Sequence, residues 1–338
     1  MSKRSAIVFA ALFVLLAAAA LVNIISGTVA TPIGDVIAIL SGRAADPVAS
    51  SVVLSIRLPR VAAAVILGGA LALSGYMLQT FFDNPIVGPF VLGISSGAKL
   101  TVALALIFYI SRGGKPGSLF LVCAAFLGAL AAMGFVLLLS LRVRSTGILV
   151  VCGIMTGYIC SAVTDLVVTF ADDANIANLH NWSMGSFSGT NSSDIGIMGV
   201  IVGLCVAGAV FLIKPIGAFR LGEDYARSGG VNITLLRTLL ILFSSLLAAT
   251  VTAFAGPISF VGIAVPHLLK GLVKTSSPAV MIPGCLLLGA LVTLCCDGIA
   301  RTIFAPTEVS VSSVTALFLV PVVIAVMIKR RKGGQGRI

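Results

Sequence analysis

The feature that most constrains this chain is a series of long apolar stretches separated by short polar segments. Several of them run for 20 residues or more without a charged side chain. A helix needs about 20 apolar residues to cross the roughly 30 Å of hydrocarbon in a bilayer. The apolar residues do not alternate with polar ones, so the pattern predicts helices rather than strands.

We therefore predict an all-α, polytopic membrane protein with about ten transmembrane helices, built as a single domain over residues 1–338. Only 10% of the residues are charged, against about a quarter in soluble domains. The first stretch is longer than the apolar part of a cleaved signal peptide, so we expect it to remain as a span. The predicted spans are residues 6–26, 58–80, 92–110, 118–140, 147–170, 195–213, 234–255, 257–272, 280–302 and 312–328.

The distribution of Lys and Arg predicts the orientation. Loops that stay in the cytoplasm are enriched in these residues. With the N-terminus inside, the inner segments hold 15 of the 22 basic residues, and both termini are cytoplasmic. The net charge of +11 then reflects topology, and we expect no nucleic-acid partner. The outer basic residues are Arg43, Arg57, Arg60, Arg112, Lys115 and Arg301.

Three of the outer arginines raise a functional question. Arg57 and Arg60 are three residues apart at the start of a predicted helix, so they share one face. They could be interfacial side chains that reach the lipid headgroups, or part of a basic rim that receives an acidic partner. Asp297 and Arg301 are spaced i, i+4 on another predicted helix, and this spacing predicts an ion pair that steadies Arg301.

Metal and cofactor sites are not predicted. The seven cysteines lie inside apolar runs and lack the spacing of zinc ligands. His267 follows Pro266 at the inner end of a predicted span, with no carboxylate at helical spacing. We expect these two residues to have a structural role near the inner face rather than to form a proton relay.

Several motifs follow one another in a fixed order. They are "RLPR" (57–60), "SGYMLQTFFDNPIVGPFVLGISSGA" (74–98), "NWSMGSFSG" (181–189), "LGEDYARSGGVNIT" (221–234), "GPISFVGIAVPHLLK" (256–270), "CDGIAR" (296–301) and Glu308. With these motifs the chain resembles the permease subunits of binding-protein-dependent ABC importers for iron–siderophore, haem and vitamin B12. The resemblance covers nearly the whole chain.

The resemblance implies partners and a location. It implies two copies of a separate ABC ATPase, an extracytoplasmic substrate-binding protein and a second permease chain, identical or related, in the lipid of a bacterial inner membrane. The chain itself has no G-x-x-x-x-G-K-[ST] motif for nucleotide phosphates. It is therefore expected to be a transport subunit and not an enzyme.

The resemblance also implies roles for individual residues. Arg57, Arg60 and Arg301 correspond to outer arginines that meet glutamates of the binding protein. A loop at about residues 214–233 corresponds to the segment that docks into the ATPase, with a short helix that begins near Glu223 and a second short segment after Gly229 and Gly230. The implied docking residues are Leu221, Gly222, Glu223, Ala226, Arg227 and Gly229, and those implied near the translocation path are Gln79, Asn84 and Pro85.

The cargo is the least constrained part of the prediction. Ferric siderophore is the first candidate, ahead of haem and cobalamin. A secondary transporter driven by an ion gradient is the alternative, with Asp165 as its clearest mid-span acid; an intramembrane enzyme would need a catalytic constellation that the sequence lacks. Three positions depart from the family pattern: Lys99, Lys270, and the serines after Glu308, where the family has Pro and Gly.

Overall fold

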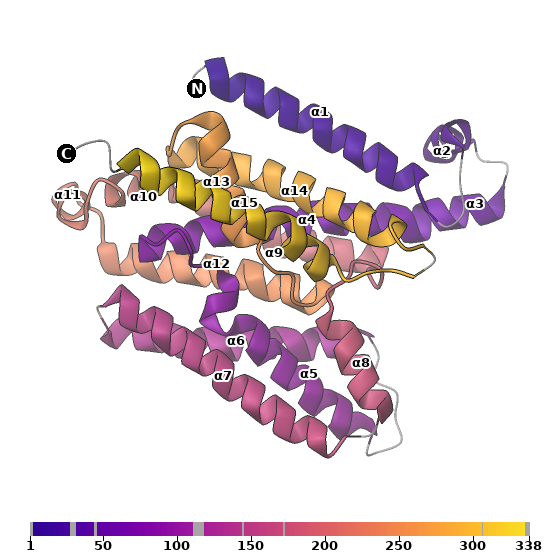
Figure 1. The fold of residues 1–338 in the computed structure, drawn as a ribbon, viewed down its shortest axis with the longest axis horizontal. Coiled ribbons are helices and arrows are strands. Elements are labelled where there is room, and N and C mark those ends of the chain that lie inside the picture. The colour runs from indigo at the N-terminus through magenta and orange to yellow at the C-terminus, as the bar shows by residue number, and fades with distance from the viewer. Residues whose placement is uncertain are drawn as a thin grey trace.

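The computed structural model describes residues 3–27, 32–43, 46–110, 118–143, 145–171, 173–305 and 307–334. Every regular element in these ranges is a helix (Figure 1). Arg112 and Lys115, two of the predicted outer basic residues, lie outside them. The helices are α1 (Lys3–Ile25), α2 (Ile33–Leu40), α3 (Pro47–Val52), η1 (Val53–Arg57), α4 (Leu58–Phe82), η2 (Pro89–Leu92), α5 (Ile94–Ile110), α6 (Ser118–Arg142), α7 (Thr146–Thr169), α8 (Asp173–Ser183), α9 (Ser192–Phe211), α10 (Ile213–Phe219), α11 (Glu223–Ser228), α12 (Ile233–Ala255), α13 (Val261–Val273), α14 (Pro278–Thr302) and α15 (Val311–Gly334).

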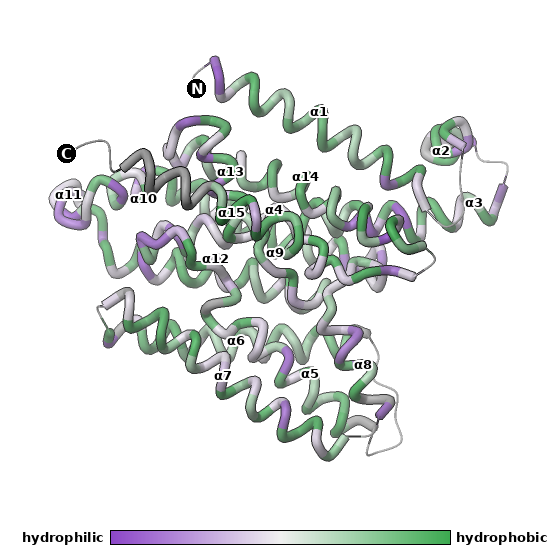
Figure 2. The backbone as a smooth tube through the Cα atoms, in the orientation of Figure 1, coloured by the Kyte–Doolittle hydropathy of each residue, from purple (hydrophilic) through white to green (hydrophobic). Residues whose placement is uncertain are grey.

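Each of the ten predicted spans contains one of these helices. Seven helical segments are long and apolar enough to cross a membrane, and three shorter apolar helices account for the other spans, at Ile94–Phe108, Val261–Val273 and Val311–Ala325. Figure 2 shows hydrophobic residues along most of α1 and α7, which lie at opposite edges of the molecule. The prediction of a polytopic, all-helical membrane protein is confirmed.

α4 is the central helix, and α12, α13 and α14 all pack against it. Small residues allow these backbones to approach closely. A Cβ atom on Gly68 would lie 2.5 Å from Oγ1 of Thr293 in α14, and one on Gly75 would lie 1.8 Å from the carbonyl oxygen of Gly262 in α13. The glycines of α4 therefore set how closely its neighbours approach.

A second group of helices, α5, α6 and α7, packs beside this centre. α12 contacts both α4 and α6, and Figure 1 shows it between the two groups. α5 and α6 also meet through glycines, since a Cβ atom on Gly97 would lie 2.7 Å from the carbonyl oxygen of Gly128.

Two irregular segments interrupt the helices. After α4 the chain continues through a turn and η2 before α5 begins, and Val87, Gly88 and Pro89 in this connection are buried. The predicted eighth span, 257–272, is helical only from Val261, because Phe260 has a left-handed backbone with a φ of 65°. Irregular backbone within a membrane is tolerated where protein covers it, and Val87, Gly88, Pro89, Gly256 and Ile258 of these segments are buried.

The two ends of the bundle carry different elements. α1 begins and α15 ends at the end that also holds α10 and α11 (Figure 1). Arg4 donates a hydrogen bond to the carbonyl oxygen of Leu272 at this end, at 2.8 Å. We call this the inner end and the opposite one, where α4 begins, the outer end. This arrangement agrees with the predicted cytoplasmic termini.

Candidate functional sites at the two ends of the bundle

A cavity of about 470 Å³ opens at the inner end. Its walls come from the end of α4, the turn after α4, the α10–α11 segment and α13. Eight residues singled out from the sequence line it, namely Gln79, Asn84, Pro85, Gly222, Glu223, Pro266, His267 and Lys270. The structure thus brings the predicted path residues, the Pro266–His267 pair and part of the docking loop into one site.

The side chain of Gln79 replaces a hydrogen bond that α13 cannot make. Pro266 has no backbone N–H, so the carbonyl oxygen of Gly262, four residues earlier, lacks its usual helical donor. Nε2 of Gln79 lies 3.4 Å from this oxygen and donates to the carbonyl oxygen of Ile263 at 3.1 Å. Gln79 therefore lines the cavity and also ties α4 to α13.

Replacing Gln79 with leucine is expected to destabilise the permease by about 1–2 kcal/mol, because the buried carbonyl oxygen of Gly262 loses the side-chain donor that substitutes for the missing N–H of Pro266. Thr80→Val is the matched control. Thr80 donates to the carbonyl oxygen of Tyr76, four residues earlier in the same helix, and that oxygen also has a backbone donor. Thermal unfolding in detergent measures both variants, and equal losses of stability would contradict this role for Gln79.

His267 holds the turn after α4 against α13. Its Nε2 lies 2.8 Å from the carbonyl oxygen of Pro85, and since a carbonyl oxygen can only accept, Nε2 carries the hydrogen. Asp83 ends α4 with a left-handed backbone, and Oδ1 of Asn84 accepts the N–H of Ile86 at 3.0 Å. This geometry supports the structural interpretation of His267. No group of potential metal ligands occurs among the described residues.

The predicted docking loop contains two short helices, α10 and α11. Gly222 separates them with a φ of 128°, a backbone conformation that favours glycine. Glu223 begins α11 and binds Arg227 at 3.0 Å and Arg237 of α12 at 2.9 Å. The guanidinium of Arg237 also lies 5.9 Å from the ring centre of Phe219 in α10. Arg237 and Glu223 thus join both short helices to α12.

One detail of this loop was predicted wrongly. We expected the second short segment after Gly229 and Gly230, but the second helix is α10, which precedes α11. The side chain of Asn232 caps α12 by accepting the N–H of Leu235 at 3.0 Å. α12 therefore begins directly after the glycines and leaves no room for another helix. Leu221, Ala226, Arg227 and Gly229 lie in or beside α11 but outside the cavity lining.

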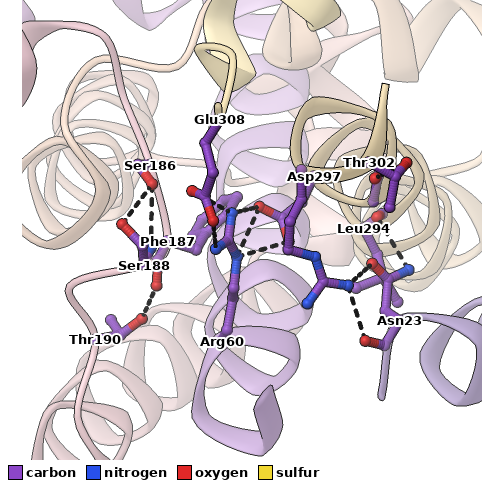
Figure 3. Close-up of polar contacts among 12 residues, drawn as sticks. Asn23, Arg60, Ser186, Phe187, Ser188, Thr190, Leu294, Asp297, Thr302 and Glu308 are labelled. Carbon is purple, nitrogen blue, oxygen red and sulfur yellow. Dashed lines mark hydrogen bonds and ion pairs between the residues drawn. The ribbon is translucent and has the colours of Figure 1, made fainter. Parts of the chain in front are cut away.

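At the outer end, Arg60 binds two carboxylates (Figure 3). Its Nε and Nη2 donate to Asp297 of α14 at distances from 2.9 to 3.1 Å. Nη1 and Nη2 donate to Glu308 at 2.8 and 3.2 Å. Asp297 is thus paired with Arg60, and the predicted Asp297–Arg301 ion pair is wrong, because the fork of Arg60 already occupies this carboxylate.

The other two arginines hold α1. Nη2 of Arg301 donates to the backbone oxygen and to Oδ1 of Asn23, at 2.8 and 3.1 Å. Nη1 of Arg57 donates to the carbonyl oxygens of Ile24 and Ile25 at 2.7 and 3.0 Å. These carbonyl groups lie at the end of α1, where helical donors run out.

The expectation of an exposed basic rim is therefore corrected. Arg57, Arg60 and Arg301 are all buried, since each satisfies backbone or carboxylate acceptors from neighbouring segments.

Sequence reasoning missed two features of the outer end. Asn23 anchors Arg301, and its position as a lone amide near the end of an apolar run was the available signal. The serines after Glu308, whose effect on the chain was left open, fix the start of α15. Ser310 donates to the carbonyl oxygen of Met184 and Ser312 to that of Pro257.

The charged residues that would suit an ion-driven transporter are not brought together. Asp165 lies on the exposed side of α7 and Lys99 is half-buried in α5. Neither forms an ion pair within the described part of the chain. His180 is exposed on α8.

Comparisons with known proteins agree with this architecture. The chain is 34% identical over 281 residues to the vitamin B12 import system permease protein BtuC of Salmonella typhi and to that of Salmonella typhimurium, which covers 82% of this chain and 83% of each relative. A solved structure assigned to the metal-chelate type of ABC transporter, in an inward-facing conformation, matches with a TM-score of 0.84 at 29% identity, over 95% of this chain and 99% of the other. PsaBC from Streptococcus pneumoniae shares the fold alone, with a TM-score of 0.53 at 15% identity over 80% of this chain and 90% of the other.

The family assignment rests on most of the chain. The family model for the FecCD transport family matches residues 15–329, a range that includes both candidate sites. The chain therefore belongs to the FecCD transport family, and it is the multi-pass permease subunit of an ABC importer of the bacterial inner membrane.

Proposed function

We propose that this permease carries a large metal chelate inward and that two copies of a separate ATPase drive the transport. One ATPase copy would dock on α10 and α11 of each permease chain. The observation that carries the proposal is the connection of these helices to α12 through the ion pair of Glu223 with Arg237. A push on the short helices would be transmitted along α12, which contacts both helix groups. The cavity at the same end would then open or close.

The exposed residues of the loop have the chemistry of a docking surface. Leu221 and Tyr225 are 70% and 60% exposed, although both are apolar or aromatic side chains. Tyrosine is enriched among the residues that contribute most to interfaces, and burying an exposed leucine beside it removes apolar surface from water. Their chain neighbours Gly222 and Glu223 belong to the cavity wall.

Removing the exposed anchors tests the docking proposal. Leu221→Ala combined with Tyr225→Ala is expected to weaken association with the ATPase about tenfold to 100-fold, as loss of two interface anchors does. Co-purification and ATPase activity in nanodiscs provide the readouts. Unchanged association with both side chains removed would contradict docking at this loop.

The ion pairs of Glu223 allow a sharper test. Glu223→Gln keeps the shape of the side chain but removes its pairing with Arg237. We expect this variant to retain the ATPase while transport per ATP hydrolysed falls about threefold or more, since an ion pair of this exposure is worth up to about 1 kcal/mol. Transport and hydrolysis that fall in proportion would mean that Glu223 does not couple the two.

For the cargo we propose ferric siderophore as the first candidate. The central helix α4 carries no charged side chain after Arg60, which suits the passage of a bulky chelate delivered by a binding protein. Vitamin B12 is the second candidate and is favoured by a specific observation, the similarity to permeases that import it. Uptake of each radiolabelled chelate, measured with an excess of the other chelate unlabelled, distinguishes the two candidates.

The remaining partners follow from the same proposal. A substrate-binding protein would deliver the chelate to the outer end, near Arg57, Arg60 and Arg301. A second permease chain, identical or related, would complete the path, because two-fold symmetry is the common arrangement for such subunits. Within this assembly residues 1–338 would act as one transmembrane domain.

A further inference from the structure

The two carboxylates that bind Arg60 at the outer end, those of Asp297 and Glu308, differ in their exposure. Arg60 is bound from one side by Asp297 and from the other by Glu308 (Figure 3). The side chain of Asp297 is 1% exposed, whereas that of Glu308 is 41% exposed. The two carboxylates therefore have unequal access to the outer solution.

The supporting backbone differs as well. Asp297 lies within the long helix α14, and it bonds Nε and Nη2 of Arg60. Glu308 belongs to the connection between α14 and α15, where Ile303, Phe304 and Thr307 are exposed. After Glu308, Val309 and Ser310 attach this connection to the bundle. The side chain of Glu308 therefore has solvent beside it into which it can rotate, whereas that of Asp297 is enclosed by protein.

We infer that Glu308 is an internal stand-in for a carboxylate of the extracytoplasmic partner, and that it must leave Arg60 before that partner can bind there. This inference rests on the proposed function, which places the binding protein at the outer end. In the free permease, Glu308 occupies the edge of the guanidinium formed by Nη1 and Nη2. An incoming Asp or Glu would find the two parallel donors that carboxylates prefer.

The replacement of Glu308 by a partner carboxylate would keep the buried guanidinium of Arg60 paired at each stage. A buried guanidinium left without its second acceptor would carry an uncompensated desolvation cost. Glu308 satisfies this edge while the partner is absent, and a partner carboxylate satisfies it afterwards. The apparent affinity for the partner is thereby the intrinsic affinity multiplied by the fraction of molecules in which Glu308 has left Arg60, so an idle permease releases its partner readily.

Removing the internal competitor is the test. Glu308→Gln is expected to bind the substrate-binding protein of the same transport system about fivefold more tightly than the unmodified permease, because a half-exposed ion pair no longer has to break. Glu308→Asp, which keeps the charge on a shorter side chain, is expected to shift binding in the same direction. Binding is measured by surface plasmon resonance on the complete transporter in nanodiscs.

Asp173→Asn is the matched control. Asp173 begins α8 at the outer side by the predicted topology, is exposed, and forms no ion pair within the described residues. The Asp173→Asn variant loses the same charge as Glu308→Gln but leaves the contacts of Arg60 intact, so we expect its affinity for the substrate-binding protein to be unchanged. Equal tightening by Asp173→Asn and Glu308→Gln would overturn the inference, since net charge would then explain both.

A second readout does not depend on the partner. Phenylglyoxal modifies accessible arginines, and mass spectrometry measures the rate. Arg60 is expected to react about threefold to fivefold faster in Glu308→Gln than in the unmodified permease, because the ion pair with Glu308 no longer has to break. Unmodified permease that binds as tightly as Glu308→Gln, with equal labelling of Arg60, would overturn the inference and leave the proposed function standing. Failure of the unmodified permease to bind any binding protein or to transport with ATP would overturn both.

Discussion

Arg60→Ala is expected to destabilise the folded permease by about 3–5 kcal/mol, the range observed when one partner of a buried ion pair is removed. The reason is Asp297, whose side chain is 1% exposed and depends on Arg60 for its charge-assisted hydrogen bonds. Glu308 contributes little to this loss because water reaches it. Thermal unfolding in detergent, followed by gel filtration, measures the effect.

The double variant Arg60→Ala/Asp297→Ala serves as the control. Removing both charges leaves no unpaired carboxylate, so the double variant is expected to be more stable than Arg60→Ala alone. If the single variant unfolds at the same temperature as the unmodified protein, Asp297 does not depend on Arg60 and the outer cluster has been assigned wrongly.

Gly75→Ala is expected to have an effect of similar size from a different cause. A Cβ atom there would lie 1.8 Å from the carbonyl oxygen of Gly262 and 2.4 Å from its carbonyl carbon. Backbone atoms cannot rotate away as a side chain does, so α4 and α13 would have to separate. We expect a loss of about 3 kcal/mol or more, at the upper end of the cost of overpacking, together with a low yield of folded protein.

Gly203→Ala in α9 is the matched control for this prediction. No atom lies within 4 Å of a Cβ atom built on Gly203. Alanine is the better helix former by about 1 kcal/mol, so this variant is expected to be as stable as the unmodified permease or slightly more so. Equal unfolding temperatures for Gly75→Ala and Gly203→Ala would contradict the close packing of α4 and α13.

The helices could be predicted from the sequence because lipid allows few alternatives. Apolar length fixed the ten spans, and loop charge suggested an orientation with which the positions of α10 and α11 agree. The short helix α11 was also predictable, because acids at its start and two glycines after it are local signals. These features depend on residues close together in the chain.

The pairings at the outer end could not be predicted in the same way. Asp297 and Arg301 have good spacing on one helix, yet Asp297 binds Arg60, which is 237 residues away. Local spacing shows which residues can meet within a helix, but not which distant donor has better geometry. The role of Gln79 was hidden for the same reason, since it compensates Pro266 on another helix.

ATP-dependent uptake into proteoliposomes tests the central claim most directly. The permease would be reconstituted with its ATPase, with the binding protein and radiolabelled ferric siderophore or cobalamin outside and nucleotide trapped in the lumen. We predict accumulation of one chelate with ATP, and none with ADP or with an imposed proton or sodium gradient. Accumulation that follows the gradient without ATP would contradict the importer mechanism and would direct attention to Asp165 and Lys99.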